Sequence, residues 1–173
     1  MKEKVINLLS WLCASAVLVM FDQYTKQLAV LHLKGQEPFV LVSGVFELLY
    51  SENRGAAFGM LQGQQGFFFI VGILVLAAAA YVMARMPSYR YSRYHFLKLC
   101  TVMITAGAVG NMVDRISQGY VVDFLYFRLI DFPIFNVADI YVTTATGLLL
   151  VLFLFYYKDE DFEIFRWGNR RQE

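Results

Sequence analysis

The sequence predicts a membrane all-α fold, in which a bundle of four transmembrane helices carries a small extracytoplasmic β-sheet and loop on its outer, membrane-surface face. Three observations lead to this fold class. The 173 residues are 58% hydrophobic and only 17% charged, unlike an ordinary soluble domain. Four apolar runs each approach the roughly 20 residues that a helix needs to cross a hydrocarbon core. Polar residues gather at one end of these runs.

The four apolar runs define the expected helices. We expect spans at about residues 5–26, 66–84, 96–114 and 139–157. The third span is the least regular, because its apolar stretch is short and ends in Gly107, Gly110, Asn111 and Asp114. Polar groups carried into a membrane at such an end are a functional hint. Since the spans use roughly half of the chain, we expect one integral-membrane domain over residues 1–173.

Lys and Arg residues are distributed unevenly around these spans. Ten of the 15 fall at the N-terminus, in the second connection and in the tail at about residues 158–173. The positive-inside rule therefore predicts that both termini are cytoplasmic and that the two long connections are outside. The first run also has the order of a cleaved signal peptide, since Lys2 and Lys4 precede an apolar core. No small-residue cleavage site follows it, which favours a retained span.

The first outer connection, at about residues 34–65, is long enough to fold on the bilayer surface. Residues 39–50 predict two short strands around a turn at Gly44. Their apolar and aromatic content suits a platform at the level of the lipid headgroups, whose backbone edge pairs with an extended peptide, or a lid over the bundle. Residues 53–59 then place small residues behind Asn53 and Arg54, which allows close backbone approach to a polar group.

Ten polar residues are expected to meet at the outer ends of the spans: Asp22, Lys26, Asn53, Arg54, Asn111, Asp114, Arg115, Asp123, Asn136 and Asp139. A local ion pair at i, i+4 spacing is a sufficient explanation for Asp22 and Lys26. Stabilisation by the helix macrodipole is an alternative explanation for Asp139. Asp123 lies in an almost wholly apolar octet, residues 120–127, where an unpaired carboxylate is costly, so a partner is implied.

Two carboxylates held together at low dielectric tend to share one proton. One of them then activates water while the other donates to a carbonyl oxygen, which is aspartic peptidase chemistry. Competing chemistries are poorly supplied, because His32 and His95 lie at opposite ends of the bundle and neither an HExxH motif nor a glycine-rich phosphate loop is present. A net charge of +1 gives no electrostatic footprint for nucleic acid.

Other readings stay open at this point. Metal binding by Asp and Asn alone is one, without further support. An ion- or proton-coupled carrier or channel is another, since ionisable residues in membrane helices often line transport routes. Carriers usually place such groups near the midplane between repeats, whereas here they lie at one surface and no repeat is visible. A purely structural scaffold would not need Asp123. A disulfide is not expected, because Cys13 and Cys100 lie in spans at unlike depths.

Five ordered motifs carry a resemblance to a known family. They are Asp22-Gln-Tyr-Thr-Lys26, Asn53-Arg-Gly-Ala-Ala-Phe58, Gly110-Asn-Met-Val-Asp-Arg115, Val121-Val-Asp-Phe124 and Phe135-Asn-Val-Ala-Asp139. Together they resemble the lipoprotein signal peptidases, the type II signal peptidases, over essentially the whole chain. The resemblance implies an endopeptidase of the bacterial cytoplasmic membrane that cuts prolipoproteins before a diacylglyceryl-modified cysteine, at the extracytoplasmic face.

The resemblance also implies roles for individual residues. Asp123 and Asp139 would be the catalytic pair. Substrate-binding or site-supporting roles would fall to Asp22, Lys26, Asn53, Asn111, Asp114, Arg115 and Asn136. The expected partners are diacylglyceryl-modified prolipoproteins, membrane lipids and globomycin-type inhibitors. We expect a monomer that uses no metal or other cofactor and binds no nucleic acid.

Overall fold

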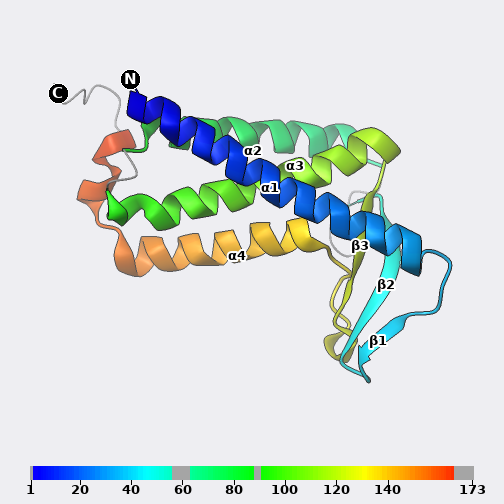
Figure 1. The fold of residues 1–173 in the computed structure, drawn as a ribbon. Coiled ribbons are helices and arrows are strands. Elements are labelled where there is room, and N and C mark those ends of the chain that lie inside the picture. The colour runs from blue at the N-terminus through cyan, green and yellow to red at the C-terminus, as the bar shows by residue number, and fades with distance from the viewer. Residues whose placement is uncertain (1, 56–62, 88–90, 166–173) are drawn as a thin grey trace.

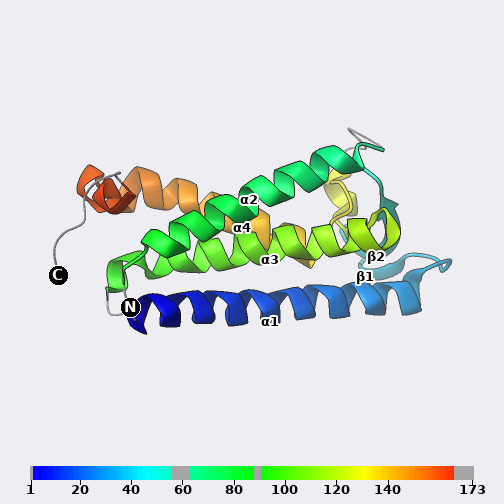
Figure 2. The ribbon, with the colours of Figure 1, turned by 90° about the horizontal axis from the view of Figure 1, so that it is seen from above.

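Four long helices and one three-stranded sheet make up the fold (Figures 1 and 2). The computed structural model describes residues 2–55, 63–87 and 91–165. The helices are α1 (Lys2–Leu33), α2 (Gln65–Arg85), α3 (His95–Gln118) and α4 (Val137–Val151), and a π-helical turn, Leu152–Tyr156, extends α4. All four are long and apolar enough to cross a membrane, which confirms the predicted number of spans.

The first helix is longer than predicted. We expected the span to close at Lys26, but α1 continues to Leu33 and stops just before Gly35, whose φ of +73° suits a turn. Residues 27–33 are mostly apolar and contain no helix breaker. Asp22 and Lys26 are therefore buried positions within the helix and do not mark its end.

Helix α3 lies at the centre of the bundle, with α1, α2 and α4 around it (Figure 2). Half of its most apolar window is buried, whereas the other three spans turn most of their apolar side chains outward. Small residues let the helices approach closely. A Cβ atom on Gly107 would lie 2.5 Å from the carbonyl oxygen of Ala138, so α3 and α4 touch through their backbones at this level.

The sheet contains β1 (Phe39–Val42), β2 (Phe46–Asn53) and β3 (Val121–Tyr126), all antiparallel in the order β1-β2-β3. The predicted hairpin is thus confirmed, while the third strand was not predicted. Every residue of β1 is exposed, although all four are apolar. Figure 1 shows the sheet at one end of the bundle, opposite the start of α1. Strands β2 and β3 therefore pack against α1, and β3 also packs against α3, at the end of the bundle where the polar residues lie.

The other end of the bundle holds the short 3-10 helix η5 (Asp159–Phe165). Arg93 binds both carboxylate oxygens of Asp161 and so fixes η5 to the start of α3. The rest of the predicted tail, residues 166–173, lies outside the described part of the chain. Cys13 is exposed and Cys100 is buried, and neither forms a disulfide.

Candidate active site

Asp123 lies in the middle of β3, opposite Ser51 of β2 and diagonally across from Asn53. Its carboxyl group accepts a hydrogen bond from Asn53 Nδ2 at 2.9 Å and another from Asn136 Nδ2 at 2.6 Å. The side chain is only 2% exposed. Burial, followed by the negative charge of Asp139, raises the pKa of Asp123 to about 7. We expected a partner for Asp123 because residues 120–127 are almost wholly apolar. In the structure this partner is a pair of neutral amides, from Asn53 and Asn136.

Asp139 lies in the first turn of α4, where it completes a capping box with Asn136. Asn136 N donates to Asp139 Oδ2 at 3.2 Å, and Asp139 N donates to Asn136 Oδ1 at 3.0 Å. The remaining oxygen, Oδ1, accepts from Asn111 Nδ2 at 2.8 Å. The position of Asp139 at a helix N-terminus favours the carboxylate form, which agrees with the alternative explanation by the helix macrodipole. The bond from α3 shows that Asp139 also belongs to a larger polar group.

Asn136 connects the two carboxyl groups. Its side-chain amide donates to Asp123, while its backbone N–H and its side-chain oxygen engage Asp139. One residue thus fixes the position of both carboxyl groups relative to each other. Asn136 itself is fully buried, so this link is not exposed to competing water.

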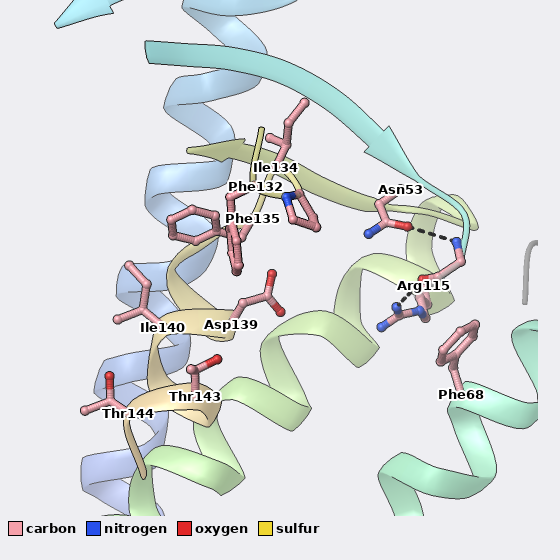
Figure 3. Close-up of a pocket in the computed structure, with 12 residues that line it drawn as sticks. Asn53, Phe68, Arg115, Phe132, Ile134, Phe135, Asp139, Ile140, Thr143 and Thr144 are labelled. Carbon is pink, nitrogen blue, oxygen red and sulfur yellow. Dashed lines mark hydrogen bonds between the residues drawn. The ribbon is translucent and has the colours of Figure 1, made fainter. Parts of the chain in front are cut away.

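A cavity of about 550 Å³ opens beside Asp139. Figure 3 shows the carboxyl group of Asp139 pointing into it from α4, with Arg115 on the opposite side. Asp123 does not line this cavity, and its buried carboxyl group is held by the amides of Asn53 and Asn136. The walls are mainly apolar, and they are formed by Asn53, Gly55, Phe68, Arg115, Phe132, Pro133, Ile134, Phe135, Asp139, Ile140, Thr143 and Thr144.

Arg115 is held at the mouth of the cavity by contacts from three elements. Its NH2 donates to the carbonyl oxygen of Gly55 at 3.1 Å, and NH1 makes a long contact of 3.5 Å to the carbonyl oxygen of Asn111. The guanidinium group lies over the ring of Phe68, 4.4 Å from its centroid. These contacts place a fixed positive charge across the cavity from Asp139 (Figure 3).

Lys26 is the centre of a buried charge cluster behind the carboxyl pair. Its ammonium group contacts Asp22 at 2.9 Å, Asp114 at 3.0 Å and Asn111 Oδ1 at 2.9 Å. The three charged side chains are at most 4% exposed. A local ion pair of Asp22 and Lys26 does exist, but it is an incomplete explanation because Asp114 from α3 shares the same ammonium group.

Nine of the ten predicted polar residues come together, and Arg54 does not. Its side chain is 65% exposed, contacts Glu52 at 3.5 Å and lies over the ring of Tyr120. Arg54 comes directly after the last β2 residue and exposes its side chain, although Asn53 before it and Gly55 after it line the cavity, so proximity in sequence to Asn53 was misleading. The small residues 56–59, which we expected to allow close backbone approach, lie outside the described residues.

Sequence reasoning also missed several residues around the site. Gln23 donates to Asp22 and to Asp114, and it lies between the two charged residues of a motif that we had singled out. Phe68 and Thr143 line the cavity from α2 and α4. Neither had a signal in the sequence, because an aromatic or a threonine in a membrane span is ordinary. Among the described residues, no three His, Cys, Asp or Glu side chains are grouped to hold a metal ion.

The fold and the site define a multi-spanning membrane protein with a paired-carboxyl site where the bundle meets its sheet. A sequence profile of the family described as signal peptidase (SPase) II matches residues 14–155. The chain belongs to this signal peptidase II family, and it is a bacterial membrane protease.

Named relatives and solved structures agree with this assignment. The chain is 40% identical over 148 residues to a lipoprotein signal peptidase of Streptococcus thermophilus, covering 86% of this chain and 92% of the relative. A lipoprotein signal peptidase of Brevibacillus brevis is 39% identical over 137 residues, which are 79% of this chain and 89% of the relative. Two bacterial membrane enzyme structures determined by the in meso method have the same fold. One has a TM-score of 0.75 at 30% identity, covering 95% of this chain and 93% of the other. The second has a TM-score of 0.73 at 32% identity, covering 86% and 94%.

Proposed function

We propose that the protein removes signal peptides from prolipoproteins by aspartic peptidase chemistry, with Asp123 and Asp139 as the catalytic pair. The observation that carries this proposal is the shared contact with Asn136, which ties the buried carboxyl group of Asp123 to that of Asp139 at the border of a cavity large enough for a peptide segment. Membership of the signal peptidase II family supplies the substrate class, since the relatives are lipoprotein signal peptidases.

The two carboxyl groups take different parts in the reaction. Asp139 borders the cavity and accepts a proton from a water molecule. The oxygen of this water attacks the scissile carbonyl carbon at the same time. Asp123, with a pKa of about 7, retains a proton near neutral pH and donates it to the carbonyl oxygen. As the tetrahedral intermediate collapses, Asp139 returns its proton to the leaving nitrogen and Asp123 regains its own. The pair titrates as a unit, so both roles depend on their closeness.

The surroundings of the pair suit a peptide that arrives from the membrane. The cavity is walled mainly by apolar side chains, and Ile140, Thr143 and Thr144 extend it along α4 into the membrane-spanning segment. A signal helix with an acyl-modified cysteine beside it needs apolar space of this kind. We therefore place the cut immediately before the diacylglyceryl-modified cysteine, with Arg115 and Asn53 binding the substrate backbone at the polar end.

The Lys and Arg distribution supports an orientation in the bacterial cytoplasmic membrane with both termini inside and the sheet outside. All the residues of the site come from one chain, which suits a monomer surrounded by lipid. A cyclic peptide inhibitor such as globomycin would occupy the cavity beside Asp139. These features make the site reachable from the outer leaflet, where a lipidated substrate diffuses.

Purified Asp123→Asn and Asp139→Asn variants test the proposal. Each should lose cleavage of a diacylglyceryl-modified prolipoprotein while it retains the thermal unfolding transition of the unchanged protein, because Asn keeps the shape and loses the proton chemistry. Asp131→Asn is the matched control, since Asp131 is an exposed carboxylate in the connection that precedes α4. Mass spectrometry of the product locates the cut. Full activity of either catalytic variant, or a cut elsewhere than before the lipidated cysteine, contradicts the proposal.

A further inference from the structure

We call Asp22, Lys26 and Asp114 the buried triad. The two carboxylates of this triad contact both chain segments that carry the proposed catalytic residues. Asp114 Oδ2 accepts from the backbone N–H of Val122 at 3.1 Å, and Val122 immediately precedes Asp123. Asp22 Oδ1 accepts from the backbone N–H of Ala138 at 2.8 Å, and Ala138 immediately precedes Asp139. Two carboxylates joined by one ammonium group therefore hold the chain one residue before each member of the catalytic pair.

Lys26 also sets the direction of a side chain that contacts Asp139. An ammonium group has three donors, and those of Lys26 are directed at Asp22, Asp114 and Asn111 Oδ1. The same Asn111 oxygen accepts from Asn136 Nδ2 at 3.2 Å. With its oxygen engaged by two donors, the amide of Asn111 presents its NH2 group to Asp139. The reversed amide would direct N–H groups at the ammonium group, which is repulsive.

Every oxygen of the triad has at least one partner. Gln23 Nε2 donates to Asp22 and to Asp114, and it also donates to the carbonyl oxygen of Gly110. Gly110 has no room for a side chain, since a Cβ atom would lie 2.5 Å from Asp22 Oδ2. A buried ion pair is in general weak evidence for stability, because desolvation offsets its attraction. Its full set of partners points instead to a role in fixing geometry.

We infer that the buried triad is the frame that sets the separation of Asp123 and Asp139, and that Lys26 is its central positioning residue. This inference rests on the proposed function of the pair. Within the part of the chain that the structure describes, Lys26 has no hydrogen bond or ion pair with either catalytic carboxyl group and does not line the cavity, so it acts on their positions through Asn111, Asp22 and Asp114. Burial has the largest effect on the pKa of Asp123, which it raises, and the positive charge of Lys26 also lowers this pKa directly. Loss of the ammonium group leaves two buried carboxylates in repulsion, which separates the segments that they hold.

The Lys26→Met variant tests this role, because methionine keeps an unbranched side chain of similar size and lacks the charge. We expect kcat to fall by about 10- to 100-fold, as a small misplacement of reacting groups does, while KM stays within about twofold. Lys34→Met is the matched control. It makes the same substitution at a largely exposed ion pair with Glu52, outside the buried triad and the cavity, so its kcat should stay within about twofold of the unchanged enzyme.

A double-mutant cycle with Asn111→Ala separates positioning from general destabilisation. If Lys26 acts through the Asn111 amide, Lys26→Met lowers kcat by a smaller factor in the Asn111→Ala background than in the unchanged enzyme. If Lys26→Met does not fold, Lys26→Met combined with Asp114→Asn replaces it, since this pair keeps the net charge of the triad. Thermal unfolding of each purified variant in detergent identifies those that fold.

Three outcomes overturn the inference: an unchanged kcat in the folded Lys26 variant, an equal fall in Lys34→Met, or factors that multiply without coupling in the cycle. The failure of the proposed function is distinguishable from these outcomes. It appears as activity in Asp123→Asn or Asp139→Asn, whereas failure of the positioning role alone leaves those two variants inactive and Lys26→Met fully active.

Discussion

The activity should fall on the alkaline side of neutrality as Asp123 loses its proton. Burial and the charge of Asp139 raise the pKa of Asp123 from an ordinary 3.8 to about 7. The proposed acid is therefore about half protonated at pH 7, about one tenth at pH 8 and about one hundredth at pH 9. Because catalysis uses the protonated form, kcat/KM should fall about fivefold from pH 7 to pH 8 and about tenfold from pH 8 to pH 9.

The assay follows cleavage of a lipidated peptide without titrating side chains, by purified enzyme in one detergent, from pH 5 to pH 9. Enzyme held at pH 9 and returned to pH 7 should recover its activity, which separates titration from unfolding. The Asn53→Ala variant gives the decisive comparison. Asn53 donates to the carboxyl group of Asp123 and lowers its pKa, so removal of this donor should move the alkaline limb to higher pH.

Two results would refute the reasoning about Asp123. A profile that stays flat to pH 9 would mean that the protonated form of this residue is not needed. An alkaline limb that moves to lower pH in Asn53→Ala would mean that the titrating group is not the one that this amide contacts. The maximal kcat/KM of Asn53→Ala is not diagnostic, since Asn53 also lines the cavity.

Three further variants probe the remaining contacts. Gly107→Ala should lower stability by about 1–3 kcal/mol, because its Cβ atom would lie 2.5 Å from the carbonyl oxygen of Ala138; an unchanged denaturation midpoint would show that α3 and α4 separate freely. Arg115→Lys should lower kcat/KM although the charge is kept, because an ammonium group cannot reproduce the guanidinium bond to Gly55 and its stacking; equal steady-state kinetics would argue against a geometric role. Asn136→Ala should lower cleavage at least 100-fold, since the carboxyl group of Asp123 loses a donor and the backbone N–H of Asp139 loses its side-chain acceptor, and substantial residual turnover would contradict the link.

Local sequence signals predicted the spans and the first hairpin. Long apolar runs identify membrane helices because no other regular segment satisfies its backbone within lipid. Gly44 between two apolar stretches identifies the turn, and its φ of +71° in the structure agrees with the conformation that glycine permits. These features depend on residues that are close together in the chain, so a single sequence contains them.

The features that were missed depend on distant parts of the chain. Residues 121–124 are all buried, so β3 lacks the alternation that identifies a half-exposed strand. The end of α1 was placed too early because Asp22 and Lys26 were treated as surface charges. Their burial is made favourable by Asp114 and Ala138, which lie roughly 90 or more positions further along the chain. No local pattern contains that information.

The candidate site was predicted as a set of residues but not as an arrangement. Charges with no simple topological explanation indicated which residues to consider, and the resemblance suggested their roles. The double contact of Asn136 with Asp123 and Asp139 follows only from the position of β3 against the start of α4. Arg54 was included for its place beside Asn53, but its side chain is 65% exposed and contacts Glu52, whereas Asn53 donates to Asp123.

Strand β1 has a consequence for handling the protein outside its native bilayer. Phe39, Val40, Leu41 and Val42 present apolar groups on both faces of an edge strand, where water solvates neither face well. Amphiphiles must therefore coat this hairpin as well as the helices after extraction. A micelle too small to cover the hairpin would leave this apolar edge strand exposed to water. Self-association of the purified enzyme should then begin at β1 rather than along the bundle.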